Sequence, residues 1–176
     1  MKAIIKTLTT AGIFISCLLS ANAFAVVVTL DVDDSTDPPT LYVSNNNAQC
    51  PGGPIDCIEV ARGSQPNMFF KLNRACQPGG AEYGLKGFYI TANPKVWPGP
   101  LEQAIASDFC ADPGTGEVNL SSCGNNQSDG QLKIKNFNRQ EVDVYYMVTA
   151  EHCSSGQEIA LDPEIRNKGG NNSDNA

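Results

Sequence analysis

The sequence contains one histidine, His152, and one tryptophan, Trp97, and aromatic residues make up only 7% of it. A single imidazole cannot supply the two histidines of a blue-copper site. The cysteines show none of the C-x2-C or paired Cys and His spacings that hold zinc. No serine lies in the G-x-S-x-G turn of a hydrolase, and so few aromatic residues make a poor sugar cleft for a glycosidase. We therefore expect a protein that is not an enzyme.

Charged residues are also sparse, at 18% of the sequence, and acidic ones predominate, because 19 Asp and Glu stand against 12 Lys and Arg. Lysine and arginine do not cluster, so we expect neither nucleic acid nor an anionic membrane as a partner. The acidity is expected mainly to keep the chain soluble. Beyond the N-terminus no apolar run approaches the roughly 20 residues that cross a bilayer, so we expect no integral membrane segment.

The N-terminus has the three parts of a secretory signal peptide. Lys2 and Lys6 provide positive charge, residues 11–19 form a short apolar stretch, and small residues follow in A-x-A spacing, ending at Ala23 or Ala25. We expect residues 1–25 to be removed by cleavage after Ala25, with cleavage after Ala23 as the alternative. The mature chain then has the size of one ordinary domain.

Export also sets the expected location. The short signal is typical of bacteria, so we expect a periplasmic or secreted protein. Lipoprotein processing would instead anchor the chain through Cys17, but Phe14 stands where leucine is usual, so this alternative is less favoured. We predict that residues 26–166 form the folded domain. Residues 167–176 are polar and rich in Gly and Asn, which predicts a disordered tail.

The seven cysteines fall to six if Cys17 leaves with the signal peptide. An even number in an exported chain predicts a disulfide framework. Sequence alone leaves the pairing open, since six cysteines can pair in many ways. Short loops favour two pairs, and the remaining cysteines form a long-range bridge. The expected disulfides are Cys50–Cys57, Cys110–Cys123 and Cys76–Cys153.

Apolar and polar residues alternate through most of the mature chain, which predicts β-strands. About eight or nine short strands separated by Gly, Pro and Asn turns favour an all-β fold of two antiparallel sheets. Segment 100–109 instead places Leu101, Ala104, Ile105 and Phe109 on one face at helical spacing, which predicts a short helix at the edge of the sandwich. The predicted strands are 26–33, 40–44, 57–61, 67–72, 84–91, 117–121, 131–137, 140–153 and 158–165.

Two stretches resemble known domains in their hydrophobic pattern. "IEVARGSQPNMFFKLN", residues 58–73, resembles the strand–turn–strand opening of many immunoglobulin-like and cupredoxin-like secreted domains. "DVYYMVTAEH" and "GQEIALDPEI" resemble the last hairpin of such a fold. The resemblance implies the fold alone, because unrelated functions share it. We expect an antiparallel, immunoglobulin-like β-sandwich stapled by disulfides.

The pair His152–Cys153 is the stretch that most suggests a reaction centre. Neighbouring side chains of a strand point to opposite faces, so the two cannot reach one substrate atom while the strand continues. A thiol nucleophile must also stay unpaired, which an oxidising compartment opposes. A serine nucleophile would need His152 as its base, yet Ser64, Ser154 and Ser155 lack the expected turn. We expect Cys153 in a disulfide and His152 at a strand end.

An acidic cluster follows the first predicted strand, in "LDVDDSTDPP". Calcium takes roughly six to eight oxygen ligands, and exported domains bind it through such carboxylates. The spacing is not that of an EF-hand, because Tyr42 stands where the final glutamate would be. A calcium site is therefore the alternative to a solvated acidic turn, which we favour. The candidate ligands are Asp31, Asp33, Asp34 and Asp37.

Trp97 lies between prolines in "NPKVWPGP". A rigid loop can present such a ring to a partner protein or to a sugar. More often the ring folds back and covers the end of a sandwich. Trp97 is thus a possible recognition residue, and the covering role is the favoured one.

These observations favour an exported, non-catalytic module that has a binding or structural role and contacts another exported protein. One alternative is a calcium-dependent or small-ligand-binding domain that uses the 31–37 loop. Another is a pilus-type subunit that exchanges strands, for which the apolar residues 26–32 would suit donation. The polar C-terminus lacks the aromatic ending expected for chaperone recognition, so we rank this hypothesis low. No cofactor other than calcium is expected.

Overall fold

The computed structural model describes residues 25–76, 83–128 and 130–169. Residues 1–24 of the expected signal peptide and residues 170–176 of the expected tail lie outside the described part. The chain is mostly β, with 49% strand and 5% helix, as the alternation predicts. No helix among the described residues has the length and hydropathy of a membrane span.

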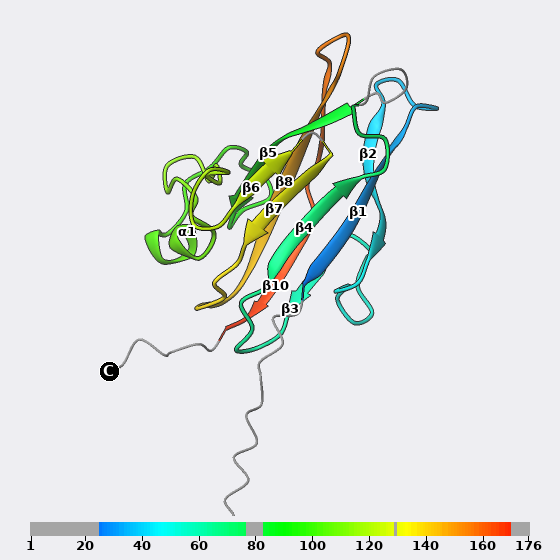
Figure 1. Cartoon of the computed structure of the whole chain (residues 1–176). Helices are drawn as coiled ribbons and strands as arrows, with labels where there is room; N and C mark the ends of the chain where they lie inside the picture. The colour runs from blue at the N-terminus through cyan, green and yellow to red at the C-terminus, as the bar shows by residue number, and fades with distance from the viewer. Residues whose placement is uncertain (1–24, 77–82, 129, 170–176) are drawn as a thin grey trace, which may run out of the picture.

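The first of the two sheets contains five strands, and the N-terminal strand lies inside it (Figure 1). In spatial order they are β2 (Thr40–Asn46), β1 (Val26–Asp33), β4 (Asn67–Leu72), β7 (Gln131–Lys135) and β6 (Asn126–Ser128). β1 pairs antiparallel with β2 and parallel with β4. Every second residue of β1 is buried, which is the pattern that alternation predicts.

The second sheet is built around the longest strand of the described chain. Its strands are β3 (Ile58–Val60), β10 (Glu164–Lys168), β8 (Glu141–His152), β5 (Tyr83–Thr91) and β9 (Glu158–Leu161). β8 pairs antiparallel with β5 on one side and with β10 and β9 on the other. β10 also pairs parallel with β3, so the C-terminal strand is an interior strand.

The prediction that both sheets are antiparallel is wrong. Each sheet contains one parallel pair, β1 with β4 and β10 with β3, so both sheets are mixed. Alternation of apolar and polar residues decides which face of a sheet a side chain occupies. It carries no information on the direction of the neighbouring strand. The immunoglobulin-like identity of the fold stays a prediction.

The prediction of a strand over residues 117–121 is also wrong. This stretch makes only isolated bridges, from Glu117 to Tyr89 and from Val118 to Ala111. Val118 is nevertheless buried, at 2% exposure. Its apolar side chain therefore fills the core from a loop, which a pattern of buried residues cannot distinguish from a strand.

The C-terminal strand pattern differs from the prediction in two respects. The single strand expected over 158–165 is two strands, β9 and β10, and the break between them contains Pro163. Proline has no N–H to give to a ladder, so it interrupts the pairing with β8. β10 then continues to Lys168, beyond the domain boundary expected at 166, and Asn167 within it is buried.

The core lies between the two sheets and contains three packed aromatic rings. The ring centroids of Phe70 on β4 and Phe88 on β5 are 4.9 Å apart. Phe88 stacks on Tyr146 of β8 with centroids 5.4 Å apart. All three side chains are buried, as the alternation predicts. The Tyr146 hydroxyl donates to the carbonyl oxygen of Asp56 at 3.1 Å, and burial raises the pKa of this phenol well above its usual value.

A segment of irregular structure between β5 and β6 carries the helix α1 (Gln103–Phe109), within the predicted range 100–109. Ile105 and Phe109 of the predicted apolar face are buried, but Ala104 is exposed and Ala106 is buried in its place, so the prediction is right only in part. The helix and its loops lie beside β6 and β7 at one side of the sheets (Figure 1).

The loop after α1 covers part of the free edge of β5. The N–H of Val118 donates to the carbonyl of Phe88 at 2.9 Å, and the N–H of Ile90 donates to the carbonyl of Gly116 at 2.8 Å. Gly116 has a φ of +73°, and a Cβ atom there would collide with the carbonyl oxygen of Ile90. Glycine is therefore needed at this position for the loop to reach the edge.

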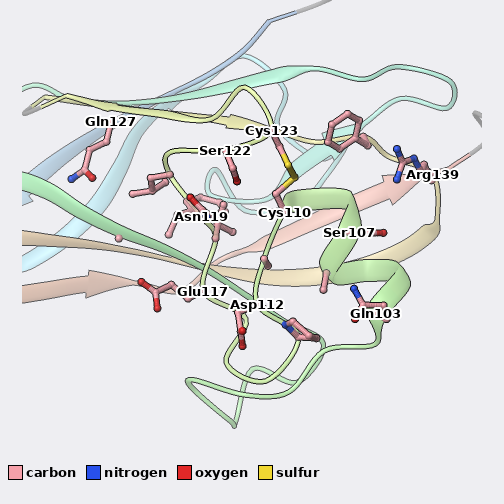
Figure 2. Close-up of a pocket in the computed structure, with 18 of the residues that line it drawn as sticks. Gln103, Ser107, Cys110, Asp112, Glu117, Asn119, Ser122, Cys123, Gln127 and Arg139 are labelled. Atoms are coloured by element: carbon pink, nitrogen blue, oxygen red, sulfur yellow. A yellow bond between two sulfur atoms is a disulfide. The ribbon is translucent and has the colours of Figure 1, made fainter.

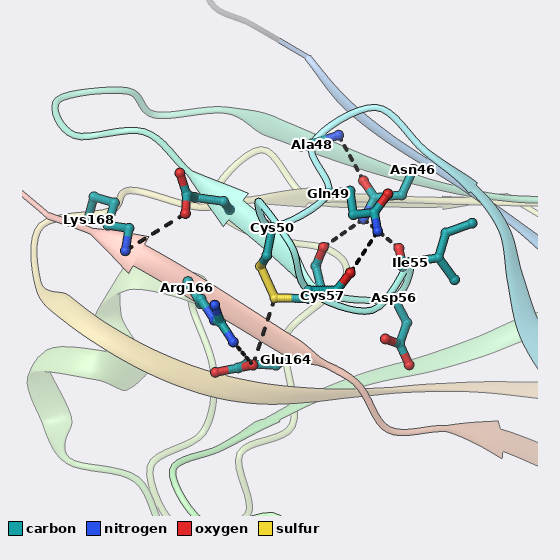
Figure 3. The surroundings of a disulfide bond; sticks show 12 residues. Asn46, Ala48, Gln49, Cys50, Ile55, Asp56, Cys57, Glu164, Arg166 and Lys168 are labelled. Carbon is teal, nitrogen blue, oxygen red and sulfur yellow. Dashed lines mark hydrogen bonds and ion pairs between the residues drawn. A yellow bond between two sulfur atoms is a disulfide. The ribbon is translucent and has the colours of Figure 1, made fainter.

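The structure forms the three expected disulfides, Cys50–Cys57, Cys76–Cys153 and Cys110–Cys123. Figure 3 shows the first of them beside β10. The side chain of Asn46 holds its loop, because Nδ2 donates to the carbonyls of Ile55 at 3.0 Å and Cys57 at 2.9 Å. This disulfide is buried, with Cys50 at 1% and Cys57 at 0% exposure.

Buried asparagines connect the loop after β7 to other parts of the chain. Asn136 Nδ2 donates to Asn167 Oδ1 in β10 at 2.8 Å. Asn138 Nδ2 donates to the carbonyls of Ala61 at 2.9 Å and Ser64 at 3.0 Å, and its Oδ1 accepts the N–H of the residue after β10 at 3.1 Å. Asn138 also has a φ of 48°, which asparagine tolerates better than most residues.

We predict that Asn138→Gly lowers the free energy of unfolding by about 3 kcal/mol, because it removes three hydrogen bonds worth roughly 1 kcal/mol each. Glycine keeps the left-handed backbone, so Asn138→Ala is the matched control and should lose about 1 kcal/mol more. Urea unfolding of the three proteins measures both differences. A glycine variant as stable as the wild type would show that the loop does not depend on this side chain.

The disulfides should differ in how much each contributes to the free energy of unfolding. Cys76 and Cys153 are 77 residues apart and Cys50 and Cys57 only 7, so the first bridge restricts the unfolded chain more. Replacing Cys76 and Cys153 by Ala should therefore cost about 2 kcal/mol more than replacing Cys50 and Cys57 by Ala. Denaturant unfolding of the two double variants tests this order, which equal losses would contradict.

Candidate functional site

The structure places His152 at the end of β8 and Cys153 in a disulfide, as the alternation argument expects. The His152 ring meets the ring of Tyr83 edge-on, with centroids 5.0 Å apart. Its Nδ1 accepts the backbone N–H groups of Ser154 at 3.4 Å and Ser155 at 3.2 Å. The imidazole therefore caps the turn that leads from β8 to β9.

The same turn brings a serine hydroxyl to the histidine, which sequence reasoning did not foresee. Ser154 Oγ lies 3.2 Å from His152 Nδ1. The lone pair of His152 Nδ1 already accepts two backbone N–H groups. Among the described residues, no carboxylate forms a hydrogen bond with the imidazole ring. A catalytic base needs both a free lone pair and an orienting partner. The contact is therefore assigned to the turn.

The carboxylates of the 31–37 loop have partners of their own. Asp33 Oδ1 accepts the Ser35 hydroxyl at 2.6 Å and the Ser35 N–H at 2.9 Å, and these bonds lower the pKa of Asp33. Asp34 forms an ion pair with Arg74. Asp31 Oδ1 accepts the N–H of the next residue at 2.9 Å.

Asp37 is exposed in the loop before β2. Within the described part of the chain, no three His, Cys, Asp or Glu side chains gather in a way that could hold a metal ion. The loop is a hydrogen-bonded acidic turn, and calcium binding there stays a prediction.

Trp97 is half-buried in the loop between β5 and α1. Its indole Nε1 is buried and has no hydrogen-bond partner among the described residues. A recognition residue would present this N–H to a partner. The burial of Nε1 favours the covering role.

An open cleft of about 970 Å³ lies beside α1 (Figure 2). Its walls come from β5, α1, the loop after α1 and the segment after β7. The Cys110–Cys123 disulfide lies at its centre, and polar side chains surround it (Figure 2). They include Gln103, Ser107, Glu117, Asn119, Gln127 and Arg139.

Asp108 fixes the wall of the cleft that carries Arg139. This carboxylate is fully buried, and its Oδ2 accepts the N–H groups of Arg139 at 2.9 Å and Gln140 at 3.1 Å. Its backbone carbonyl accepts the N–H of Phe137 at 2.9 Å. The Arg139 guanidinium in turn lies 4.8 Å from the centroid of the Phe137 ring. α1 therefore positions both side chains.

The opposite wall is a tight turn followed by an acidic side chain. Asp112 Oδ1 accepts the N–H groups of Gly114 at 2.8 Å and Thr115 at 2.9 Å, and these bonds lower the pKa of Asp112. Glu117 follows, and its carboxylate has no hydrogen bond or ion pair within the described residues. Figure 2 shows Glu117 and Arg139 on different sides of the disulfide.

Gln127 closes the cleft where the two sheets meet. Its Nε2 donates to the carbonyl of Leu85 at 2.7 Å, which joins β6 of one sheet to β5 of the other. The cleft thus combines positive, negative and amide groups. Sequence reasoning missed this site, although the helix that interrupts the strand pattern was the available signal.

Comparison with known proteins finds no family model that matches the chain and no curated protein with significant similarity to it.

Asp108 should make stability depend on pH. Burial raises the pKa of Asp108, so the folded protein holds this proton more tightly than the unfolded chain does. The stabilisation is present at low pH and is lost as pH rises through the raised pKa. Asp108→Asn should remove this pH-dependent part of the stability. At pH 7 the variant should be at least as stable as the wild type, because Oδ1 of the asparagine can still accept the N–H groups of Arg139 and Gln140.

The control is Asp108→Ala, which leaves the N–H groups of Arg139 and Gln140 without an acceptor and should cost about 1–3 kcal/mol at every pH. Urea unfolding between pH 4 and 7 gives the difference between each variant and the wild type. A constant difference for Asp108→Asn across that range would contradict the raised pKa.

Proposed function

We propose that this chain is an exported, non-catalytic module of immunoglobulin-like type that binds another exported protein through the cleft beside α1. The observation that carries the proposal is a wide cleft that holds the charged groups of Arg139 and Glu117. The Arg139 guanidinium lies 4.8 Å from the centroid of the Phe137 ring, and neither it nor the Glu117 carboxylate makes a hydrogen bond or ion pair among the described residues. Such groups are available to a ligand.

A polypeptide segment fits this chemistry. Guanidinium pairs with carboxylate, Glu117 pairs with a basic side chain, and the amides of Gln103 and Asn119 suit the N–H and C=O groups of a backbone. A sugar would need a free aromatic face to stack on. Two phenylalanines line the cleft, and neither offers a free face. Phe88 is buried in the core, and the cations of Arg139 and Lys135 lie 4.8 Å and 5.8 Å from the centroid of the Phe137 ring.

The disulfides support the proposed location of the protein outside the cytoplasm. Three disulfides indicate an oxidising environment. With the predicted signal peptide, they support a periplasmic or secreted protein whose partner is exported as well. The acidic composition, with a formal net charge of −7, gives no support to a nucleic acid partner.

The strand-exchange hypothesis receives less support. A donated strand must be free, yet β1 pairs with both β2 and β4 and buries every second residue in the chain's own core. Removing it would expose that apolar surface to water, which is costly. We therefore keep binding at the cleft as the proposed function.

Photo-crosslinking in the exporting host tests the proposal. Benzoylphenylalanine replaces Ser107 in the cleft or, as a control position, the exposed Ser44 on β2. We expect a discrete adduct with another exported protein from position 107 and none from position 44. The double variant Glu117→Lys and Arg139→Glu keeps the net charge and should reduce this adduct about tenfold, which corresponds to roughly 1.4 kcal/mol of binding.

The matched control is the double variant Lys71→Glu and Glu158→Lys, which swaps two exposed charges outside the cleft. It should leave the adduct unchanged. An adduct that forms equally from both positions, or that survives the cleft swap, would overturn the proposal.

A further inference from the structure

Both halves of the Cys110–Cys123 disulfide have a left-handed backbone, with φ of 55° and 54°. Among the described residues other than glycine, only Asn138 shares this property. A side chain with a Cβ atom is destabilised in this conformation, and asparagine is least affected after glycine. The other four bridged cysteines do not have it.

Each of the two positions is one where glycine or asparagine is usual. Cys110 ends α1, and its N–H donates to the carbonyl of Ala106, a place normally taken by glycine. Cys123 and Gly124, with φ of 54° and 82°, are the central residues of a turn that the Asn125 N–H closes at 2.8 Å. Two successive positive φ angles define a type I′ turn, which favours Asn-Gly. The disulfide therefore holds two cysteines in unfavourable conformations.

This bridge is also accessible. Cys123 is exposed and Cys110 is half-buried, and both line the cleft (Figure 2). Cys50 and Cys57, by contrast, are buried. Strained and exposed disulfides are the ones that exchange with thiols most readily.

The loop that the bridge closes forms the wall of the cleft. The N–H of Asn119 donates to the carbonyl of Cys110 at 3.0 Å, and the N–H of Gly116 donates to the carbonyl of Asp112 at 2.7 Å. Two backbone hydrogen bonds to β5 and the buried Val118 side chain hold the middle of the loop. Opening the bridge would remove the covalent link between the two ends of the wall that carries Glu117.

We propose that Cys110–Cys123 is a thiol–disulfide exchange site, at which a dithiol reductant opens the cleft and abolishes binding there. This inference rests on the proposed function, since it assigns a regulation to the same cleft. Reduction lets both cysteines leave the left-handed region. Release of that strain favours the open state.

The exchange requires a dithiol as electron donor. One thiolate of the dithiol attacks the exposed Sγ of Cys123, and the S–S bond breaks with its electron pair on Cys110 Sγ, which takes a proton from water. The second thiolate attacks the mixed disulfide, releases Cys123 as a thiolate and leaves the donor as a disulfide. Two electrons pass from the dithiol to the protein.

Graded reduction of the oxidised protein with dithiothreitol tests the site. Samples are quenched with acid, alkylated and mapped by mass spectrometry. Cys110 and Cys123 should be labelled at least tenfold faster than any other pair. Cys76–Cys153 is the matched control, because Cys153 is also exposed but neither half has a positive φ. Equal or faster labelling of that pair would overturn the proposal.

Amide hydrogen exchange tests the effect on the cleft. After selective reduction, the amides of Gly116 and Val118 should exchange at least tenfold faster, whereas the amide of Tyr146, which donates to Pro163 at 2.8 Å, should not change. Unchanged loop amides would show that the bridge does not control the wall. Neither readout needs a binding partner, so failure of the crosslinking experiment would remain a separate result.

A pair of variants separates strain from cross-linking. Cys110→Gly with Cys123→Asn removes the bridge and places residues that suit the backbone, whereas Ala at both positions removes the bridge alone. The Gly/Asn variant should keep more loop protection than the Ala/Ala variant. Equal protection would contradict the role assigned to strain.

Discussion

The segment 136–140 is held by buried polar side chains, and both sheets, the last strand and the helix depend on it. Here the chain passes from β7 in one sheet to β8 in the other. Asn136 reaches Asn167 in β10, Asn138 reaches the loop between β3 and β4, and Asp108 of α1 accepts two backbone N–H groups. Buried polar groups without partners would cost free energy, so one set of hydrogen bonds positions all these elements together.

The features that the sequence predicts well are those set by local pattern. Alternation identified the buried faces of β1, β4 and β8, and helical spacing located α1. Loop length favoured two of the three disulfides that the structure contains, and the third joins the two cysteines that remained. Each of these depends on residues close in the sequence or on a small set of cysteines. Whether two strands pair in parallel or antiparallel does not depend on such local residues. The parallel neighbours of β1 and β10 were therefore missed.

The cleft could not be predicted, because its walls are loops whose shape depends on distant partners. Val118 alternates with its neighbours like a strand residue, yet it is buried from a loop that glycine at 116 brings against β5. Arg139 lies in the wall because a carboxylate on α1 holds its backbone. His152 illustrates the same limit, since the hydroxyl of Ser154 reaches it only through the geometry of one turn. Strand periodicity gives no information on either arrangement.

The interior position of β10 has a consequence for how the chain folds as it is synthesised. β1, β2 and β4 leave the ribosome early and can pair with one another, but β3 has no strand beside it in the second sheet until β10 arrives. Contacts between segments so distant in sequence slow folding, because the intervening chain must be ordered first. The second sheet can therefore close only after nearly the whole domain has been synthesised. Until then the edge of β3 is open to pairing with other chains.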